Sequence, residues 1–506
     1  MALRAKSDDV RKWRVICRPL HYIGQIMKHD VFYKAMLARD YRFDGKFFIG
    51  VKTTGIYCRP ICPAKPKQEN VEFFLTAIAA EKSGYRPCLR CRPECAPLSP
   101  AWYGKSAVVQ RALRVIAADG FFAADENAFA EKFGVTARHL RRLFADEVGQ
   151  TPKQIAFNNR LNFARKLVVE CKLSMTFVAT TAGFLSLRRF NDAFKKRFHR
   201  TPSALRKNQT HLDDSNITLS LSYRPPFDWA TLLDFYRSHQ IMGVESVSEY
   251  AYERIFQIGK AIGHIRVTHK EDEAQLRLQV QVSDPAVLFA VAQKVRQMFD
   301  LDSDPLLVTN SFQSQTFLNF VCKKYPGLRL ARGWDPFETA ICTILGQLVS
   351  VEQARALVRQ LVEGYGEIVL HPVTGKNAFM FPSAHILARA DLSKVKTTHA
   401  RKNAIREFSR LVASGEIDLN LPRDAEASIQ QLLSVSGIGP WSAEYISLRA
   451  LGNTDAFPGT DLILKRAMDR HPDLDLEKIR PWRSYAAIYL WKHYANLLSK
   501  KKGAQK

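Results

Sequence analysis

The sequence predicts a multidomain, mainly α-helical protein from three observations: its length, the distribution of its charge and the periodicity of its apolar residues. With 506 residues, 46% of them hydrophobic, the chain can bury about two to four domain cores. Apolar residues recur at helical spacing over residues 103–206 and again from about 313 to 500. Between these segments, LSLSYRPPFDW, IGHIRVTHK and AQLRLQVQV have the composition of strands, so we expect a β-sheet there.

Positive charge is concentrated in the first part of the chain. Residues 1–211 hold 39 basic and 17 acidic side chains, whereas residues 212–506 hold 36 and 32. This surplus favours a polyanionic partner, because each neutralised phosphate releases condensed counterions. A nucleic acid is therefore the expected partner.

The sequence indicates no secretory signal and no transmembrane helix. Its basic N-terminus lacks an apolar core segment, and no span of eighteen apolar residues occurs. We expect a cytoplasmic, nucleoid-associated protein of bacterial type without a membrane partner. Its nine cysteines should then stay reduced, which favours metal or catalytic roles over disulfides.

Four cysteines form two close pairs, Cys58 with Cys62 and Cys88 with Cys91. Two pairs separated by a spacer are typical of a structural Zn²⁺ site, since zinc binds thiolates tetrahedrally. Free buried thiols are the alternative. Several basic residues near the pairs form a candidate phosphate-binding patch: Arg59, Lys65, Lys67, Arg86, Arg90 and Arg92.

The segment FDGKFFIGVKTTGIYCRPICPAKPKQENVEFF, followed by GYRPCLRCRPE, resembles the N-terminal domain of the Ada methylation-response proteins over about residues 28–96. The resemblance implies a small α/β domain holding one Zn²⁺, in which Cys58 irreversibly accepts a methyl group from a DNA methylphosphotriester. It also places Thr54 and Arg86 against the DNA backbone. Methylating one of four thiolates lowers the negative charge of the site, so DNA affinity should rise. A purely structural zinc domain is the alternative.

An internal repeat lies in the following helical segment. HLRRLFADEVGQTP at 139–152 aligns with RFNDAFKKRFHRTP at 189–202, and a glycine turn precedes each copy at Gly134 and Gly183. This arrangement predicts two helix-turn-helix units, although solvated charges on ordinary amphipathic helices remain the alternative. The segment resembles the all-α DNA-binding domain of AraC-type regulators. The resemblance favours DNA contacts from Arg138, Arg141, Arg142, Arg188, Arg189 and Asn191.

A polar, turn-rich stretch near residues 206–218 marks the main boundary, because the charge balance changes across it. The predicted organisation is an N-terminal extension (1–27), a zinc domain (28–96), a double helix-turn-helix (101–206), a linker (207–216), an α/β subdomain (217–312) and a helical domain (313–500).

The segment SGIGPWSAEY contains a glycine-bearing hairpin between two apolar helical stretches, and Asp461 follows Trp441 by twenty residues. Backbone N–H groups in such a hairpin can face a phosphate, so Gly437 and Gly439 are candidate DNA contacts. An aspartate that precedes an apolar helical run is usually an N-cap. From this feature alone, a catalytic role for Asp461 stays a minority hypothesis.

A wider set of segments strengthens the hypothesis that Asp461 is catalytic. RPPFDWATLLDFY, GWDPFETAICTILGQLVSVEQARAL, SGIGPWSAEYISLRAL, FPGTDLILKR and PWRSYAAIYLWKHY resemble, in order and spacing, the AlkA family of alkyladenine DNA glycosylases over about residues 217–495. The resemblance implies an α+β enzyme with a TATA-binding-protein-like sheet and a helix-hairpin-helix domain.

Several residue roles follow from the resemblance to the AlkA family. Asp461 is the implied catalytic residue, and Gln347 and Leu348 form the implied wedge in DNA. The implied base pocket consists of Phe235, Trp441, Tyr445 and Trp491, and carbonyls of Leu433, Val435 and Ile438 are the implied ligands of a monovalent cation. Three positions depart from the family pattern, namely Thr460, Leu462 and His239.

These residue types suit the excision of alkylated purines such as 3-methyladenine. Such bases carry positive charge, so they stack on electron-rich rings and leave without a general acid, while one carboxylate stabilises the oxocarbenium-like centre. Trp441 stands where lyase-type relatives carry a lysine, which predicts a monofunctional glycosylase. We expect a bifunctional alkylation-response monomer that contacts double-stranded DNA and RNA polymerase. The alternative is a transcription regulator whose glycosylase-like half binds lesions without catalysis.

Overall fold

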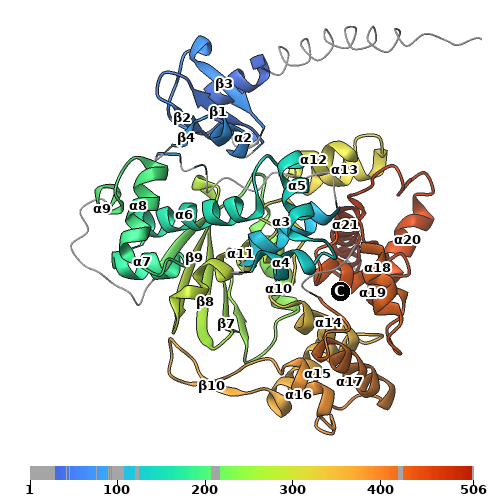
Figure 1. Cartoon of the computed structure of the whole chain (residues 1–506). Coiled ribbons are helices and arrows are strands. Elements are labelled where there is room, and N and C mark those ends of the chain that lie inside the picture. The colour runs from blue at the N-terminus through green and yellow to red at the C-terminus, as the bar shows by residue number, and fades with distance from the viewer. Residues whose placement is uncertain are drawn as a thin grey trace, which may run out of the picture. The chain divides into compact units, whose positions relative to one another are not determined.

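The structure is a computed structural model, and it describes residues 29–40, 43–44, 46–75, 77–88, 90–91, 93, 107–119, 125–171, 173–206, 217–419 and 425–503. The chain divides into two compact units, residues 1–101 and residues 102–506, which we describe separately (Figure 1). The predicted extension 1–27 and the predicted linker 207–216 lie outside the described residues.

The first unit contains a four-stranded sheet in the order β3-β1-β2-β4. Residues 29–37 are helical, and the labelled elements are β1 (Phe48–Val51), β2 (Ile56–Cys58), η3 (Gln68–Asn70), β3 (Val71–Phe74), α2 (Ala77–Lys82) and β4 (Arg86–Pro87). Its apolar core is small, with Phe47 stacked on Phe32 at a ring distance of 4.3 Å. This unit matches the predicted small α/β domain.

The second unit begins with helices that follow the predicted repeat. They are α3 (Ala107–Asp119), α4 (Glu126–Glu131), α5 (Ala137–Glu147), α6 (Pro152–Glu170), α7 (Met175–Thr181), α8 (Leu187–Phe198) and α9 (Pro202–Leu205). Gly134 and Gly183 adopt positive φ angles of 69° and 75° in the two turns, which glycine tolerates best. The N-caps Thr136 and Ser186 stand at equivalent positions before α5 and α8, so both predicted helix-turn-helix units are present.

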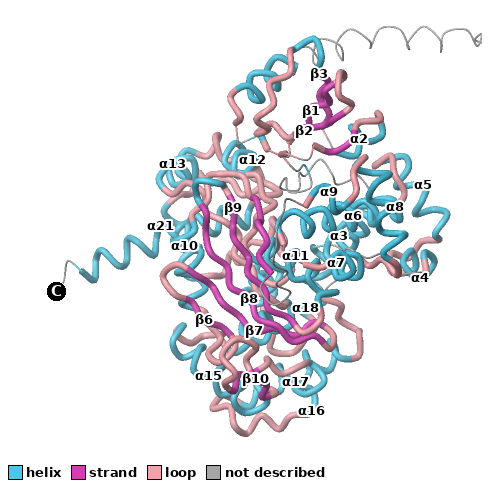
Figure 2. The backbone as a smooth tube through the Cα atoms, turned by 90° about the vertical axis from the view of Figure 1, so that its left-hand side faces the viewer, coloured by secondary structure: helices cyan, strands magenta, loops and turns pink. Residues whose placement is uncertain are grey.

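A five-stranded antiparallel sheet follows, in the order β5-β9-β8-β7-β6 (Figure 2). Its strands are β5 (Ile217–Ser222), β6 (Glu245–Val247), β7 (Ala251–Ile258), β8 (Ala261–Lys270) and β9 (Gln275–Val282), and the associated helices are α10 (Trp229–Ser238), η6 (Glu271–Glu273), η7 (Pro285–Val287) and α11 (Leu288–Met298). The strand predicted from LSLSYRPPFDW ends at Ser222, because Pro225 and Pro226 cannot donate ladder hydrogen bonds.

Helix α6 covers the outer edge of this sheet. The Ser220 N–H of edge strand β5 donates to Glu170 at 2.9 Å, and the Ser220 carbonyl accepts a hydrogen bond from Lys166. Phe163 of α6 packs edge-to-face on Phe289 of α11, with ring centroids 5.1 Å apart and both side chains buried. The linker helix of the helix-turn-helix pair and the sheet therefore share one hydrophobic core, and α6 pairs both backbone groups of Ser220 on the edge strand.

The remainder is mainly helical, as predicted. It comprises α12 (Pro305–Ser311), α13 (Thr316–Lys324), α14 (Pro336–Leu345), α15 (Val351–Tyr365), α16 (Ala384–Arg389), α17 (His399–Ala413), α18 (Ala425–Leu433), α19 (Pro440–Arg449), α20 (Leu462–Arg470) and α21 (Arg483–Gly503). One exception is the antiparallel hairpin of β10 (Ile368–Leu370) and β11 (Asn377–Phe379), where the sequence predicted only helix. A turn containing Gly375, with φ of 65°, allows this hairpin. Within the described ranges, no helix is long and apolar enough to cross a membrane.

Candidate metal centre, DNA-reading helices and base pocket

The four predicted metal ligands come together in the first unit. Cys58 ends β2 and Cys88 follows β4, while Cys62 and Cys91 lie in the adjoining turns. All four sulfur atoms lie within 4.8 Å of one another, and all four side chains are buried. Tetrahedral Zn²⁺ with Zn–S bonds of about 2.3 Å needs sulfur atoms about 3.8 Å apart, so this thiol set fits the metal.

Backbone N–H groups reach three of the four sulfurs. Cys91 accepts from the Arg59 N–H at 3.3 Å, Cys88 accepts from the Arg90 N–H at 3.4 Å, and Cys62 accepts from the Ala64 backbone. A hydrogen bond stabilises the negative charge on a thiolate and so weakens it as a nucleophile. In the part of the chain that the structure describes, no backbone donor reaches the sulfur of Cys58.

Arg59 has a different role from the one that its sequence position suggests. Its side chain is 4% exposed and pairs through two guanidinium nitrogens with the fully buried Asp44, and it also donates to the Cys91 carbonyl at 3.1 Å. The prediction that Arg59 belongs to a phosphate-binding patch is therefore wrong, because its charge is neutralised inside the unit. Arg59 and Asp44 instead brace the ligand loops. Arg92, the last member of the predicted patch, lies outside the described residues.

The two other predicted DNA contacts of this unit meet at one corner. Thr54 is exposed in the turn between β1 and β2, and the adjacent Gly55 carbonyl accepts the Arg86 N–H at 2.8 Å. Arg86 is half-buried, whereas Lys65, Lys67 and Arg90 are exposed. A threonine hydroxyl and a guanidinium in this arrangement can contact one stretch of phosphate backbone.

The two helix-turn-helix units present different surfaces. In α8, the phenylalanines Phe190, Phe194 and Phe198 are fully buried, whereas Arg188 and Arg189 are exposed and Asn191 is half-buried. In α5, Leu140 and Phe144 form the buried stripe and Arg138, Arg141 and Arg142 are exposed. Arg141 lies 3.4 Å from Glu126, and Arg142 contacts His139. Two arginines of the first helix-turn-helix therefore already have partners within the protein.

Asp461 lies at the N-terminus of α20, as predicted, and its carboxylate is held by four N–H groups. One oxygen accepts from the backbone of Ile463 and Leu464 and from the Trp491 indole at 3.0 Å, and the other accepts from the Trp441 indole at 3.2 Å. The N-cap role predicted as the alternative is therefore present together with contacts to two pocket residues. The carboxylate is half-exposed, so a ligand can reach it.

The four predicted pocket aromatics are linked by one residue that the sequence did not single out. Trp441 stacks on Tyr445 at a ring distance of 5.0 Å. The Arg449 guanidinium lies 4.2 Å from the Phe235 ring and within 5.7 Å of the rings of Tyr445 and Trp491. Because Trp441, Tyr445 and Arg449 are four residues apart in α19, helical periodicity could have identified Arg449 as a member of the same stripe.

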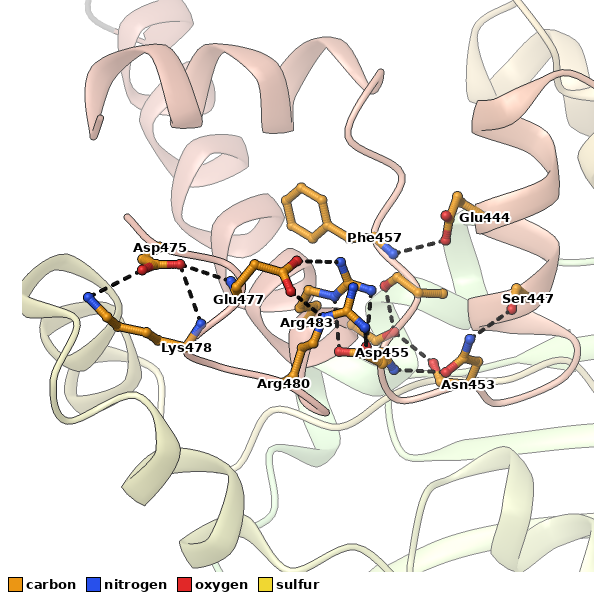
Figure 3. Close-up of polar contacts among 12 residues, drawn as sticks. Glu444, Ser447, Asn453, Asp455, Phe457, Asp475, Glu477, Lys478, Arg480 and Arg483 are labelled. Atoms are coloured by element: carbon orange, nitrogen blue, oxygen red, sulfur yellow. Dashed lines mark hydrogen bonds and ion pairs between the residues drawn. The ribbon is translucent and has the colours of Figure 1, made fainter. Parts of the chain in front are cut away.

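A polar network anchors the loop that leads to Asp461 (Figure 3). Arg483, at the start of α21, donates two hydrogen bonds of 3.0 Å to Asp455, and Arg480 lies 3.3 Å from the same carboxylate. The Phe457 N–H donates to Glu444 of α19 at 3.1 Å, and burial raises the pKa of Glu444. These contacts tie the loop to the two helices that carry Trp441 and Trp491.

The predicted wedge residues behave differently from each other. Leu348 is fully exposed and has a positive φ angle of 55°, an unfavourable conformation for leucine that projects its side chain outward. Gln347 is turned inward, since its amide donates to the Gly437 carbonyl at 2.9 Å and to Ser442 at 2.8 Å. Gly437 has a φ of 90°, and an added Cβ would lie 2.8 Å from Ala404, so glycine is required there. Gly439 is the N-cap of α19.

The three departures from the family pattern lie near this pocket. Thr460 and Leu462 flank the aspartate, and Leu462 is 60% exposed. His239 stacks on Phe235 with ring centroids 4.3 Å apart. Desolvation by its surroundings lowers the pKa of His239, although part of the side chain stays exposed to solvent.

Comparison with known proteins identifies the domains of this chain. Family models match for the metal binding domain of Ada (residues 31–94), a helix-turn-helix domain (129–208) and the AlkA N-terminal domain (218–335). The chain is 36% identical over 482 residues to a probable bifunctional transcriptional activator/DNA repair enzyme AlkA from Mycobacterium tuberculosis, covering 92% of this chain and 96% of that relative.

Two further matches concern the second half. DNA-3-methyladenine glycosylase 2 of Escherichia coli is 30% identical over 285 residues, which is 54% of this chain and 96% of that protein. The solved 3-methyladenine DNA-glycosylase from Archaeoglobus fulgidus is 19% identical with a TM-score of 0.46, covering 54% of this chain and 98% of its own.

Fold and sites together define a multidomain DNA-binding protein in which a four-cysteine metal domain and a double helix-turn-helix precede a glycosylase-type domain. The chain belongs to the family of bifunctional transcriptional activators and DNA repair enzymes that combine Ada-type and AlkA-type parts. The Ada-type and AlkA-type resemblances and the predicted helix-turn-helix domain are thereby confirmed.

Proposed function

We propose that the second half hydrolyses the N-glycosidic bond of alkylated purines such as 3-methyladenine, with Asp461 as the catalytic residue. The observation that carries this proposal is the double indole clamp, in which Trp441 and Trp491 each donate to one carboxylate oxygen. The clamp fixes a negative group beside aromatic rings. A fixed carboxylate stabilises the oxocarbenium-like sugar as a cationic base departs, without reorganisation at the moment of reaction.

The rings would hold the flipped base. An alkylated purine is positively charged, and stacking of a cation on Trp or Tyr is worth about 1–2 kcal/mol. Leu348 would occupy the gap that the base leaves in the duplex, because its side chain is apolar and fully exposed. Gln347 would position Leu348 through its two contacts with the hairpin segment.

The test is release of free 3-methyladenine from methylated DNA by the full-length protein. Asp461→Asn should lower the rate at least a hundredfold, because it removes the charge and keeps the size of the side chain. Asp469→Asn, an exposed aspartate on the same helix α20, is the matched control and should keep the wild-type rate. Trp491→Phe retains a ring but loses the N–H donor, so it separates the clamp from stacking.

The alternative, a regulator that binds lesions without catalysis, gives a different result. In that case the wild-type protein retains methylated DNA but releases no free base.

We also propose that the enzyme is monofunctional, because Trp441 follows the hairpin where a lyase needs an amine. A covalent adduct with DNA after borohydride treatment would contradict this part.

We further propose that zinc-bound Cys58 accepts a methyl group from DNA methylphosphotriesters in a single irreversible transfer. Support comes from the uneven hydrogen bonding, which leaves this thiolate without a backbone donor within the described residues. The products would be a thioether on Cys58 and an unmethylated phosphodiester. Cys58→Ser should accept no methyl label, whereas Cys171→Ser, a buried cysteine outside the cluster, should accept it normally.

We propose that the methylated protein binds promoter DNA and contacts RNA polymerase, and that it acts as a cytoplasmic monomer associated with the nucleoid.

A monovalent cation would bind the carbonyls of Leu433, Val435 and Ile438. Replacing all monovalent metal ions in the buffer with choline should then weaken binding to abasic-site DNA.

A further inference from the structure

One leucine at the entry to α8 has no packing role. Leu185 is 97% exposed, and it immediately precedes Ser186, the N-cap of this helix. The corresponding position in the first helix-turn-helix, fifty residues earlier, is Val135, which is half-buried. The two copies therefore share their capping and glycine turn but differ in this apolar side chain.

Single exposed leucines are common on protein surfaces, so exposure alone would carry no weight. Leu185 is distinguished by how exposed its side chain is and by its position at the start of α8. Among the described residues, the two most exposed large apolar side chains are Leu348 and Leu185. The first is the candidate DNA wedge of the glycosylase domain, and the second stands at the N-terminal end of the second recognition helix.

The surroundings of Leu185 indicate what it meets. The buried stripe of Phe190 and Phe194 turns the opposite side of α8 outward, and Arg188 and Arg189 are exposed in its first turn. Positive charge beside the leucine suits a phosphate-flanked groove. In a helix-turn-helix, the N-terminal residues of the recognition helix contact base edges in the major groove.

The chemistry of the major groove leaves one partner for an apolar side chain. Its base edges present hydrogen-bond donors and acceptors, and the C5 methyl group of thymine is the apolar feature. We infer that Leu185 reads a thymine methyl group and is a specificity-determining residue of the second helix-turn-helix. This inference rests on the promoter-binding part of the proposed function, and it is independent of the glycosylase part.

The probe is a duplex selected from a pool of random sequences by the full-length, zinc-loaded protein after incubation with DNA that carries methylphosphotriesters. Each thymine of the selected duplex is replaced in turn by deoxyuridine, which removes only the methyl group, and affinity is measured by fluorescence anisotropy. Burying one methyl-sized group changes affinity roughly fourfold. The wild-type protein should therefore lose about fourfold at one or two thymines.

Variants assign that loss to the leucine. In Leu185→Ala the same deoxyuridine replacements should have little effect, since the contact is already gone, whereas Val135→Ala should keep the wild-type profile. Leu185→Ala should leave the salt dependence of binding unchanged. Arg188→Ala should reduce its slope by about one, as expected for a lost phosphate contact.

Three outcomes would overturn the inference or its basis. An identical deoxyuridine profile in wild type and Leu185→Ala excludes methyl reading. Loss of transcription activation with unchanged DNA affinity would assign Leu185 to a protein partner such as the polymerase. If the protein selects no sequence from the pool, the promoter-binding function itself fails, which is distinguishable from failure at Leu185 alone.

Discussion

The two compact units of this protein hold their folds together by different means. Among its described residues, the first has a cluster of six buried apolar residues and a separate cluster of four buried cysteines. The second has three large hydrophobic clusters, one of which joins the helix-turn-helix pair to the sheet. In the first unit the proposed methyl acceptor therefore also belongs to the buried cluster that holds the fold, whereas the proposed catalytic Asp461 is not part of the hydrophobic clusters of the second unit.

Metal removal should affect the two units most unequally. Structural Zn²⁺ contributes roughly 10–16 kcal/mol of apparent binding free energy in small zinc domains. Chelation should therefore unfold residues 29–93, seen as rapid proteolysis and loss of amide protection in that range. Release of 3-methyladenine by the second unit should continue unchanged.

Single substitutions give the same contrast without a chelator. Cys88→Ser should lower bound zinc, measured by elemental mass spectrometry, to near zero. Cys322→Ala removes a buried cysteine of the second unit and should keep full zinc occupancy. If Cys88→Ser lost glycosylase activity as well, the two units would not be independent.

The second prediction concerns the core that the helix-turn-helix pair shares with the sheet. Phe163→Ala removes a buried ring that packs on Phe289, which should cost about 3–5 kcal/mol of unfolding free energy. Because the core is continuous, thermal unfolding of the helices and inactivation of the glycosylase should shift together. Phe157→Ala, on the same helix but 42% exposed, is the control and should have a much smaller effect. Separate transitions for the two domains would contradict a shared core.

Particular residues show how much of the sites could be predicted from the sequence alone. The roles expected for Asp461, Trp441 and Tyr445 come from the AlkA-type resemblance, because the local sequence alone favoured an N-cap at Asp461, and the Cys58–Cys91 cluster follows from spacing. Periodicity can place Arg449 on the stripe of Trp441 and Tyr445 but not against Phe235, and the Asp44–Arg59 pair depends on burial and on partners from distant segments. The contact between α6 and strand β5 was also missed, since a polar linker at 207–216 suggested two independent domains.

The third prediction is a pH dependence confined to the second unit. Burial, with the neighbouring His371 and Arg266, lowers the pKa of His264 to about 4, although Glu253 lies 3.4 Å away. The unfolded chain, with a histidine pKa of about 6.5, binds a proton that the folded state does not bind between these values. Stability is therefore lost as pH falls below 6.5.

The expected size of this effect is about 2 kcal/mol between pH 7 and pH 5. Urea unfolding of the second unit at the two pH values measures it. His264→Gln should flatten the dependence by that amount, whereas His399→Gln, an exposed histidine at the start of α17, should leave the slope unchanged. An unaltered slope in His264→Gln would exclude burial of this imidazole as the cause.

The smallest expected effect tests α6 at its beginning. Thr151 caps this helix of 19 residues in a capping box with Gln154, and Thr201, its counterpart in the repeat, caps α9 with four residues. Thr151→Ala should lower the unfolding free energy by about 1 kcal/mol, and Thr151→Ser should restore it because the hydroxyl is kept. Since α6 also covers strand β5, Thr151→Ala should lower the midpoint of thermal inactivation of base release, whereas Thr201→Ala should not. An unchanged midpoint of inactivation in Thr151→Ala, despite a lower unfolding free energy, would show that the cap matters only locally and that the shared core does not transmit stability from the helix-turn-helix pair to the glycosylase.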